Sequence, residues 1–124
     1  MLYVNEKRLL DLFKKLVETD SPSGAERKVC DILKSELGKL NISVFEDSSG
    51  KYINGNAGNI YAYIEGDIAL PPVLFSAHMD TVAPAKNKKC VIDYDGKIHS
   101  DGTTVLGSDD FAGICLSLIH ISEP

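Results

Sequence analysis

The chain has 124 residues, of which 44% are hydrophobic and 25% charged, with a formal net charge of −5. This globular composition excludes disordered, collagen-like and fibrous proteins, and the longest apolar run, residues 68–75, is interrupted by two prolines and too short to span a membrane. Because basic residues are interspersed with acidic ones, we expect neither nucleic acid nor an anionic membrane as a partner.

Two helices are predicted near the start of the chain. Apolar residues recur at helical spacing over residues 5–18, and Asn5 is a suitable N-cap for this first helix. A loop rich in Ser, Pro and Gly follows. Ser23 and Glu26 then form a capping-box pattern that predicts a second helix, and Gly38 is expected to end it.

After the second predicted helix, the residue pattern changes to short apolar runs separated by turn residues, which is typical of strands. Strands are expected over residues 42–45, 60–64, 73–77, 90–94 and 97–100. The last two flank Asp95 and Gly96, a strong signal for a two-residue hairpin. A final helix is expected to begin at Asp109 or Asp110. The sequence therefore predicts an α/β domain with two helices followed by a mixed sheet, in which residues 73–77 form a strand buried on both faces.

A candidate site follows that predicted central strand, in the segment SAHMDTV. His78 lies at the end of the strand and Asp80 two residues later, where both side chains can point the same way. Asp80 can then accept a hydrogen bond from one ring nitrogen and leave the other free for a metal. The alternative is a histidine paired with a carboxylate without any metal. His99 and Asp101 repeat the spacing without such a strand, and we interpret His99 as a turn histidine.

A second candidate site lies in the segment LGSDDFAG, at the start of the last predicted helix. Asp109 and Asp110 are adjacent there, and because like charges repel, the pair favours a bound cation. A carboxylate can bridge two metals ~3.5–4 Å apart. The alternative is that Asp109 caps the helix and Asp110 lies in its first turn.

Taken together, HMDTV at residues 78–82 and GSDDFAG at residues 107–113 resemble the co-catalytic zinc peptidase family, which includes peptidase T, carboxypeptidase G and succinyl-diaminopimelate desuccinylase. The segment ETDSPSGAE at residues 18–26, between the two predicted helices, also matches this family. The resemblance extends from about Asn5 to Gly113 and is strongest to the peptidase T branch.

The resemblance implies a role for three residues: His78 as a ligand of one zinc ion, Asp80 as the group that orients His78, and Asp109 as a bridge between two zinc ions. It also implies a cis peptide bond between Asp109 and Asp110. The implied activity is zinc-assisted hydrolysis in which a glutamate takes a proton from water. The peptidase T branch removes the N-terminal residue from tripeptides, so the expected partner is a short peptide.

Three features depart from the family pattern. The family's Glu-Glu base and remaining ligands lie well beyond the second motif, so we expect this chain to be an N-terminal fragment that is inactive alone and binds zinc weakly. Phe111 stands where the family usually has lysine. Residues 1–115 are expected to form the first part of the catalytic domain. Residues 116–124 resemble translated sequencing-adapter sequence and are expected to be a non-native or frayed tail.

Two other functions stay open at this point: a non-catalytic α/β module that binds a metal or a partner, and a related amidohydrolase such as a carboxypeptidase or an aminoacylase. The N-terminus lacks the basic start and apolar core of a secretory signal. The three cysteines form no CxxC pair, which favours free thiols in a cytoplasmic protein. We also expect an uncovered apolar surface and marginal folding in isolation, while the oligomeric state is not predicted.

Overall fold

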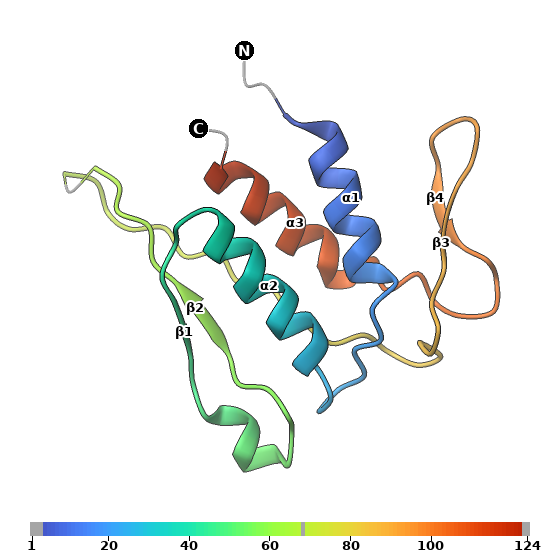
Figure 1. Cartoon of the computed structure of the whole chain (residues 1–124), viewed down its shortest axis with the longest axis horizontal. Helices are drawn as coiled ribbons and strands as arrows, with labels where there is room; N and C mark the ends of the chain where they lie inside the picture. Colours follow the sequence, from blue (N-terminus) through green and yellow to red (C-terminus); the bar gives the residue numbers. More distant parts are fainter. Residues whose placement is uncertain (1–3, 68, 123–124) are drawn as a thin grey trace.

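Three helices in this computed structural model, which describes residues 4–67 and 69–122, enclose one apolar core. They are α1 (Glu6–Val17), α2 (Arg27–Lys39) and α3 (Ser108–Ser122). α1 and α3 pack side by side, and α2 contacts a small antiparallel sheet on its outer side (Figure 1). A second hairpin stands alongside α1, on the side away from α2 (Figure 1). This arrangement confirms the predicted α/β class.

The strands are short and pair as two separate hairpins. β1 (Val44–Glu46) pairs antiparallel with β2 (Ile60–Ala62), and the 3-10 helix η1 (Ser49–Ile53) lies between them in the chain. β3 (Cys90–Ile92) pairs antiparallel with β4 (Ile98–Ser100), which confirms the predicted hairpin, but the strands are shorter than predicted and the connection is longer than two residues. The sheets are therefore two antiparallel pairs rather than one mixed sheet. Among the described residues, parallel pairing is limited to one isolated bridge, between Pro22 and Thr81.

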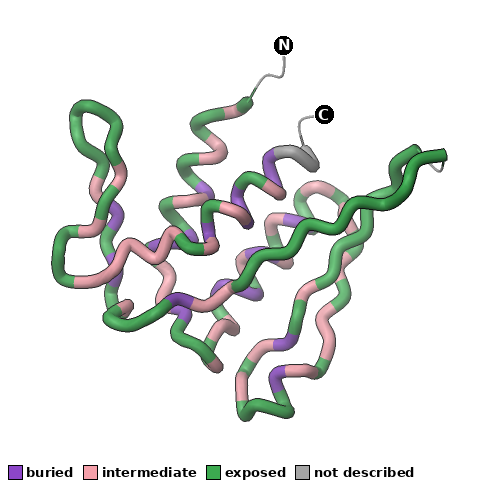
Figure 2. The backbone as a smooth tube through the Cα atoms, turned by 180° about the vertical axis from the view of Figure 1, so that it is seen from behind, coloured by how far each residue is buried: buried purple, intermediate pink, exposed green. Residues whose placement is uncertain are grey.

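The predicted buried strand over residues 73–77 is wrong. This segment belongs to no strand in the described part of the chain, and it stays exposed along its length (Figure 2). Val73, Leu74 and Phe75 are 76%, 89% and 71% exposed. An apolar segment becomes a strand only when neighbouring backbone takes up its N–H and C=O groups, and no other described segment lies in that position. The exposed side chains agree with the uncovered apolar surface expected from the sequence.

The cap of α1 is formed by a residue close in sequence, whereas the start of α2 is bonded to a residue far along the chain. Asn5 caps α1 as predicted, because its Oδ1 accepts from the backbone N–H of Arg8 at 3.0 Å. The capping-box prediction for α2 is wrong: Asn56, far along the chain, accepts from the backbone N–H of Arg27 at 2.9 Å. α2 also runs past Gly38 to Lys39, and the left-handed residue that follows is Asn41, with φ of 57°.

The core is formed by apolar side chains from all three helices and from β3. Its members are Leu12, Leu16, Val17, Val29, Leu33, Leu37, Cys90, Phe111, Ile114, Cys115 and Leu118. The three cysteines are buried and free, as expected, and burial raises the pKa of Cys115 to about 12. Within the described residues, no helix has the length and apolar character needed to cross a membrane. The predicted tail is helical as far as Ser122, and residues 123–124 lie outside the described part; whether this tail is native stays a prediction.

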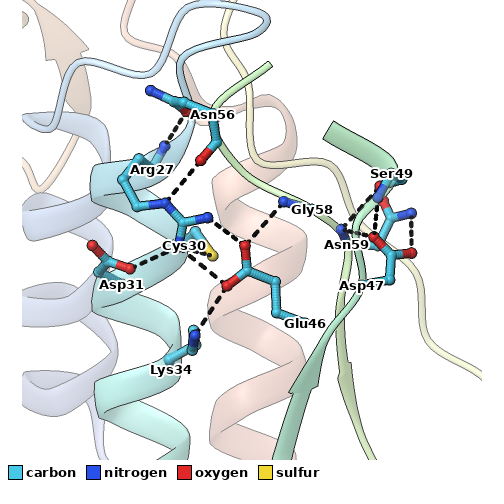
Figure 3. Close-up of polar contacts among 10 residues, drawn as sticks. All are labelled: Arg27, Cys30, Asp31, Lys34, Glu46, Asp47, Ser49, Asn56, Gly58 and Asn59. Atoms are coloured by element: carbon cyan, nitrogen blue, oxygen red, sulfur yellow. Dashed lines mark hydrogen bonds and ion pairs between the residues drawn. The ribbon is translucent and has the colours of Figure 1, made fainter. Parts of the chain in front are cut away.

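A charged network centred on Glu46 joins α2 to the first hairpin (Figure 3). Its carboxylate pairs with the Arg27 guanidinium and accepts from Lys34 Nζ at 2.9 Å and from the backbone N–H of Gly58 at 3.0 Å. The Arg27 guanidinium, the Gly58 N–H and Lys34 together hold the pKa of Glu46 well below its usual range. Arg27 Nε also donates to the Asn56 carbonyl at 2.9 Å, so the network fixes the start of α2.

Replacing Glu46 with glutamine is expected to lower the free energy of unfolding by about 1–2 kcal/mol at pH 7, which is the range for partly exposed hydrogen bonds to charged groups. Because the folded pKa lies below the unfolded value of ~4.3, the stabilisation is complete above that value and is lost as the pH falls below it. In urea unfolding at pH 7, 5 and 3.5, the free energy of unfolding should therefore fall less with decreasing pH for Glu46→Gln than for the wild-type chain. Glu65→Gln, in an exposed loop, is the matched control, and an equally steep acid decline in both variants would contradict the prediction.

Candidate active site

The three residues predicted to form the site lie together in the structure. The ring of His78 is placed between two carboxylates: its Nδ1 is 2.9 Å from Asp80 Oδ1, and its Nε2 is 3.1 Å from Asp109 Oδ1. Nδ1 is also 3.1 Å from the backbone oxygen of Asp80. His78 and Asp109 are thus neighbours although 31 residues separate them in the sequence. Both are open to solvent, with side chains that are 52% and 93% exposed.

The start of α3 brings Asp109 to this position. Gly107 adopts a left-handed conformation with φ of 75°, and a Cβ atom there would lie 2.9 Å from the Thr81 side chain. Only glycine allows both the conformation and this close approach to the segment that follows His78. Asp109 then departs from helical geometry, with φ of −92° and ψ of 108°. The junction therefore holds the two halves of the site against each other.

The two adjacent aspartates have different partners. Asp110 Oδ1 accepts from the backbone N–H of Gly113 at 3.1 Å, which is the hydrogen bond of a helix N-cap. The interpretation of Asp109 as the capping residue is therefore wrong, because Asp110 fills that role and Asp109 faces His78. The peptide bond between Asp109 and Asp110 is cis, as the resemblance implied.

A loop residue that the sequence interpretation assigned to helix capping is also part of this site. The Ser23 hydroxyl donates to Asp80 Oδ2. Next to it, the backbone oxygen of Ser21 accepts from the N–H of Thr81 at 2.8 Å, and Ser21 Oγ donates to the Met79 oxygen at 2.6 Å. The signal in the sequence was the Ser-Pro-Ser-Gly segment, but nothing in its spacing points to residues nearly 60 positions away.

The electrostatics favour positive charge on the ring. Partial burial lowers the pKa of His78, but the hydrogen bonds to Asp109 and Asp80 outweigh it and raise the pKa overall. The Ser23 hydroxyl, together with His78, holds the pKa of Asp80 below its usual range against the effect of burial. When Nδ1 donates to Asp80 in the neutral ring, the Nε2 lone pair faces the carboxylate of Asp109. That contact is favourable only with a proton or another cation between the two atoms.

The donors present are of the kind that zinc takes, since imidazole nitrogen and carboxylate oxygen are both common ligands. Their number is smaller than a zinc site requires: protein zinc sites use three or four protein ligands, and the described residues contain no group of three or more His, Cys, Asp or Glu arranged to hold a metal. His78 and Asp109 therefore fit as part of a ligand set, on a surface open to further ligands.

His99 and Phe111 lie outside this arrangement. His99 Nε2 is 2.9 Å from Asp93 Oδ1 across the β3–β4 hairpin, so the same H-x-D spacing does not produce the same pairing here. Instead, Asp101 accepts from the Thr103 backbone N–H at 3.0 Å. The Phe111 side chain is fully buried in the core. Its burial gives a physical reason for an aromatic residue directly after Asp110.

Comparison with solved structures shows that the chain is similar to part of two peptidases. A tripeptidase from Staphylococcus aureus matches with a TM-score of 0.88 and 41% sequence identity, over 95% of this chain and 32% of that protein. The aminopeptidase PepT from Bacillus cereus matches with the same TM-score and 36% identity, over the same shares. Over nearly its whole length the chain is thus similar in fold and sequence to one part of these two peptidases, and it spans about a third of the length of either protein.

Sequence comparison gives related results. The uncharacterized protein YqjE of Bacillus subtilis is 40% identical over 111 residues, which cover 90% of this chain and 30% of that protein. A probable carboxypeptidase of Arthroderma gypseum is 38% identical over 88 residues, covering 65% of this chain and 19% of its own length. No family model matches the chain.

Proposed function

We propose that this chain supplies part of the active site of a zinc-dependent peptidase that removes the N-terminal residue from short peptides such as tripeptides. The observation that carries the proposal is the placement of the His78 ring between the carboxylates of Asp80 and Asp109. The similarity to a tripeptidase and to an aminopeptidase, at 41% and 36% identity, supports the substrate class.

Each residue has a distinct task in this proposal. Asp80 holds Nδ1 of His78 and so fixes the ring orientation and directs Nε2 toward Asp109. His78 Nε2 and a carboxylate oxygen of Asp109 would serve as ligands of the bound zinc. Bound zinc polarises a peptide carbonyl and lowers the pKa of water, which is the chemistry that peptide hydrolysis requires. The glutamate base implied by the family resemblance is not among the residues matched to the motifs.

A carboxypeptidase is the second candidate. Fungal probable carboxypeptidases are 31–38% identical to this chain over 65% of its length. The residues that hold the metal would be the same in both cases, whereas the choice between the two ends of a peptide depends on groups that recognise the free amine or the free carboxylate. The substrate class must therefore be tested directly.

A chimera tests the metal-site role that both candidates share. Residues 5–113 of this chain replace the matching segment of the S. aureus tripeptidase, and hydrolysis is followed with a free tripeptide, an N-acetylated tripeptide and a C-terminally amidated tripeptide. We expect zinc-dependent release of the N-terminal residue from the free and the amidated peptides only. In the chimera, His78→Ala and Asp109→Asn should each lower kcat/KM at least ~100-fold, beyond the usual cost of removing an outer partner.

His99→Ala in the same chimera is the control, because His99 lies on a separate hairpin and should leave the rate unchanged. A chimera with the circular dichroism and melting behaviour of the parent enzyme that cleaves neither end of any peptide would contradict both candidates.

A further inference from the structure

The loop between α1 and α2 holds the backbone that carries His78. Four hydrogen bonds join residues 21–23 to residues 79–81: Thr81 N–H to the Ser21 oxygen, Ser21 Oγ to the Met79 oxygen, Thr81 Oγ1 to the Ser21 oxygen, and Ser23 Oγ to Asp80 Oδ2. The first two surround the parallel bridge between Pro22 and Thr81. Ser21 and Thr81 are buried, at 0% and 3% exposed, so this part of the contact is a packed structural anchor.

Ser23 is different from that anchor because it contacts a side chain of the site. Ser23 is exposed, and its hydroxyl does not cap α2. The first N–H of α2 donates instead to Asn56. Asp80 has two carboxylate oxygens, and the structure gives each one partner: Oδ1 faces His78, while Oδ2 receives the Ser23 hydroxyl. The hydroxyl therefore restricts rotation of the carboxylate about its last bond.

The need for such a contact follows from the surroundings of His78. The preceding residues, 73–77, are exposed and belong to no strand in the described part of the chain. The ring itself is half exposed. Its orientation depends on contacts after it in the sequence, and the Asp80 carboxylate is the side chain that holds Nδ1.

We propose that Ser23 is a positioning residue, which fixes the Asp80 carboxylate and through it the orientation and Nδ1-protonated tautomer of the His78 ring. This inference rests on the proposed function in one respect only, namely that the oriented Nε2 serves as a metal ligand. The relay runs from the α1–α2 loop through Ser23, Asp80 and His78 to Asp109 at the start of α3.

The test uses the whole chain, labelled with ¹⁵N at histidine, in alkaline solution where the imidazole is neutral. In the wild-type chain we expect the His78 ring to show a single tautomer with the proton on Nδ1. In Ser23→Ala the ring nitrogen shifts should move toward those of a mixture of tautomers, and in Ser23→Thr, which keeps the hydroxyl, they should return toward wild type. Ser35→Ala, at an exposed position on α2, is the matched control and should change nothing.

Zinc binding measured by calorimetry gives a second readout. Ser23→Ala should weaken zinc affinity about ten-fold, the lower end of the range for groups that support a ligand. Unchanged ring shifts in a folded Ser23→Ala variant would overturn the positioning role, even if the wild-type chain binds zinc. Altered ring shifts in a chain that binds no zinc would instead preserve the positioning role and contradict the proposed metal site, so the two failures are distinguishable.

Discussion

Replacing Phe111 with alanine is expected to lower the free energy of unfolding by about 3–5 kcal/mol, the range found for large-to-small changes at fully buried aromatic residues. Phe111 is 0% exposed and is the largest of the fully buried side chains. A domain of this size has a total stability of about 5–15 kcal/mol, so the variant should lose a large share of it. Urea unfolding followed by circular dichroism measures the change.

Two further variants identify the cause. Phe111→Leu keeps most of the apolar volume and should cost less than ~1.5 kcal/mol if the core repacks around it. Leu116→Ala removes an apolar side chain from the same helix at a position that is 54% exposed, and it should change stability by less than ~1 kcal/mol. A loss below 1 kcal/mol in Phe111→Ala would show that the side chain is not packed as the structure describes.

The burial of Phe111 also bears on the site. It follows Asp110 directly, and its side chain ties the first turn of α3 to the core formed with α1 and α2. The two aspartates are therefore directly attached to a residue that is fixed in the core. Asp110 caps the helix and Asp109 faces His78. A lysine at this position would place an ammonium group in apolar surroundings, which is costly unless the side chain reaches solvent. The departure from the family pattern thus has a packing explanation in this chain.

Local patterns predicted most of the secondary structure. The apolar spacing of α1 and α2, the Asn5 cap and the turn at Asp95 and Gly96 all depend on residues within a few positions of one another. The two helices, the cap and the hairpin are confirmed, although the connection between β3 and β4 is longer than the predicted two residues. Contacts between distant segments were beyond the reach of such patterns. Residues 73–77 have the composition of a buried strand, but pairing depends on where other backbone lies.

The candidate site was predicted to a similar extent. Spacing alone suggested that Asp80 orients His78, and the observed distance of 2.9 Å from Asp80 Oδ1 to Nδ1 agrees. The pairing of His78 with Asp109 came from the combination of two motifs in a family resemblance, since nothing local joins residues 31 positions apart. Ser23 was assigned to the wrong partner because a capping box is a local pattern, whereas its hydroxyl is taken by a carboxylate across the fold. The tertiary structure thus determines that the Ser23 hydroxyl bonds to Asp80 rather than capping α2.

Replacing His78 with alanine is expected to lower the affinity of the chain for zinc by more than ~100-fold, since removing a ligand should exceed the 10- to 100-fold cost of removing a supporting group. The wild-type affinity should itself be weak, because the site offers two of the three or four protein ligands that zinc sites use. Isothermal calorimetry, or competition with a weak chromophoric chelator, measures the constants. His99→Ala, which removes the histidine of the β3–β4 hairpin, should leave them unchanged.

A double-mutant cycle then decides whether His78 and Asp109 hold the same ion. If they share one metal, Asp109→Asn should weaken binding about as much as His78→Ala, and the double variant should be little worse than either single one, because the first change already removes the site. If they act on separate ions, the two losses should add, and each single variant should keep part of the binding heat. Because the ring and the carboxylate are 3.1 Å apart, we expect the non-additive result, and strictly additive losses would contradict a shared metal centre.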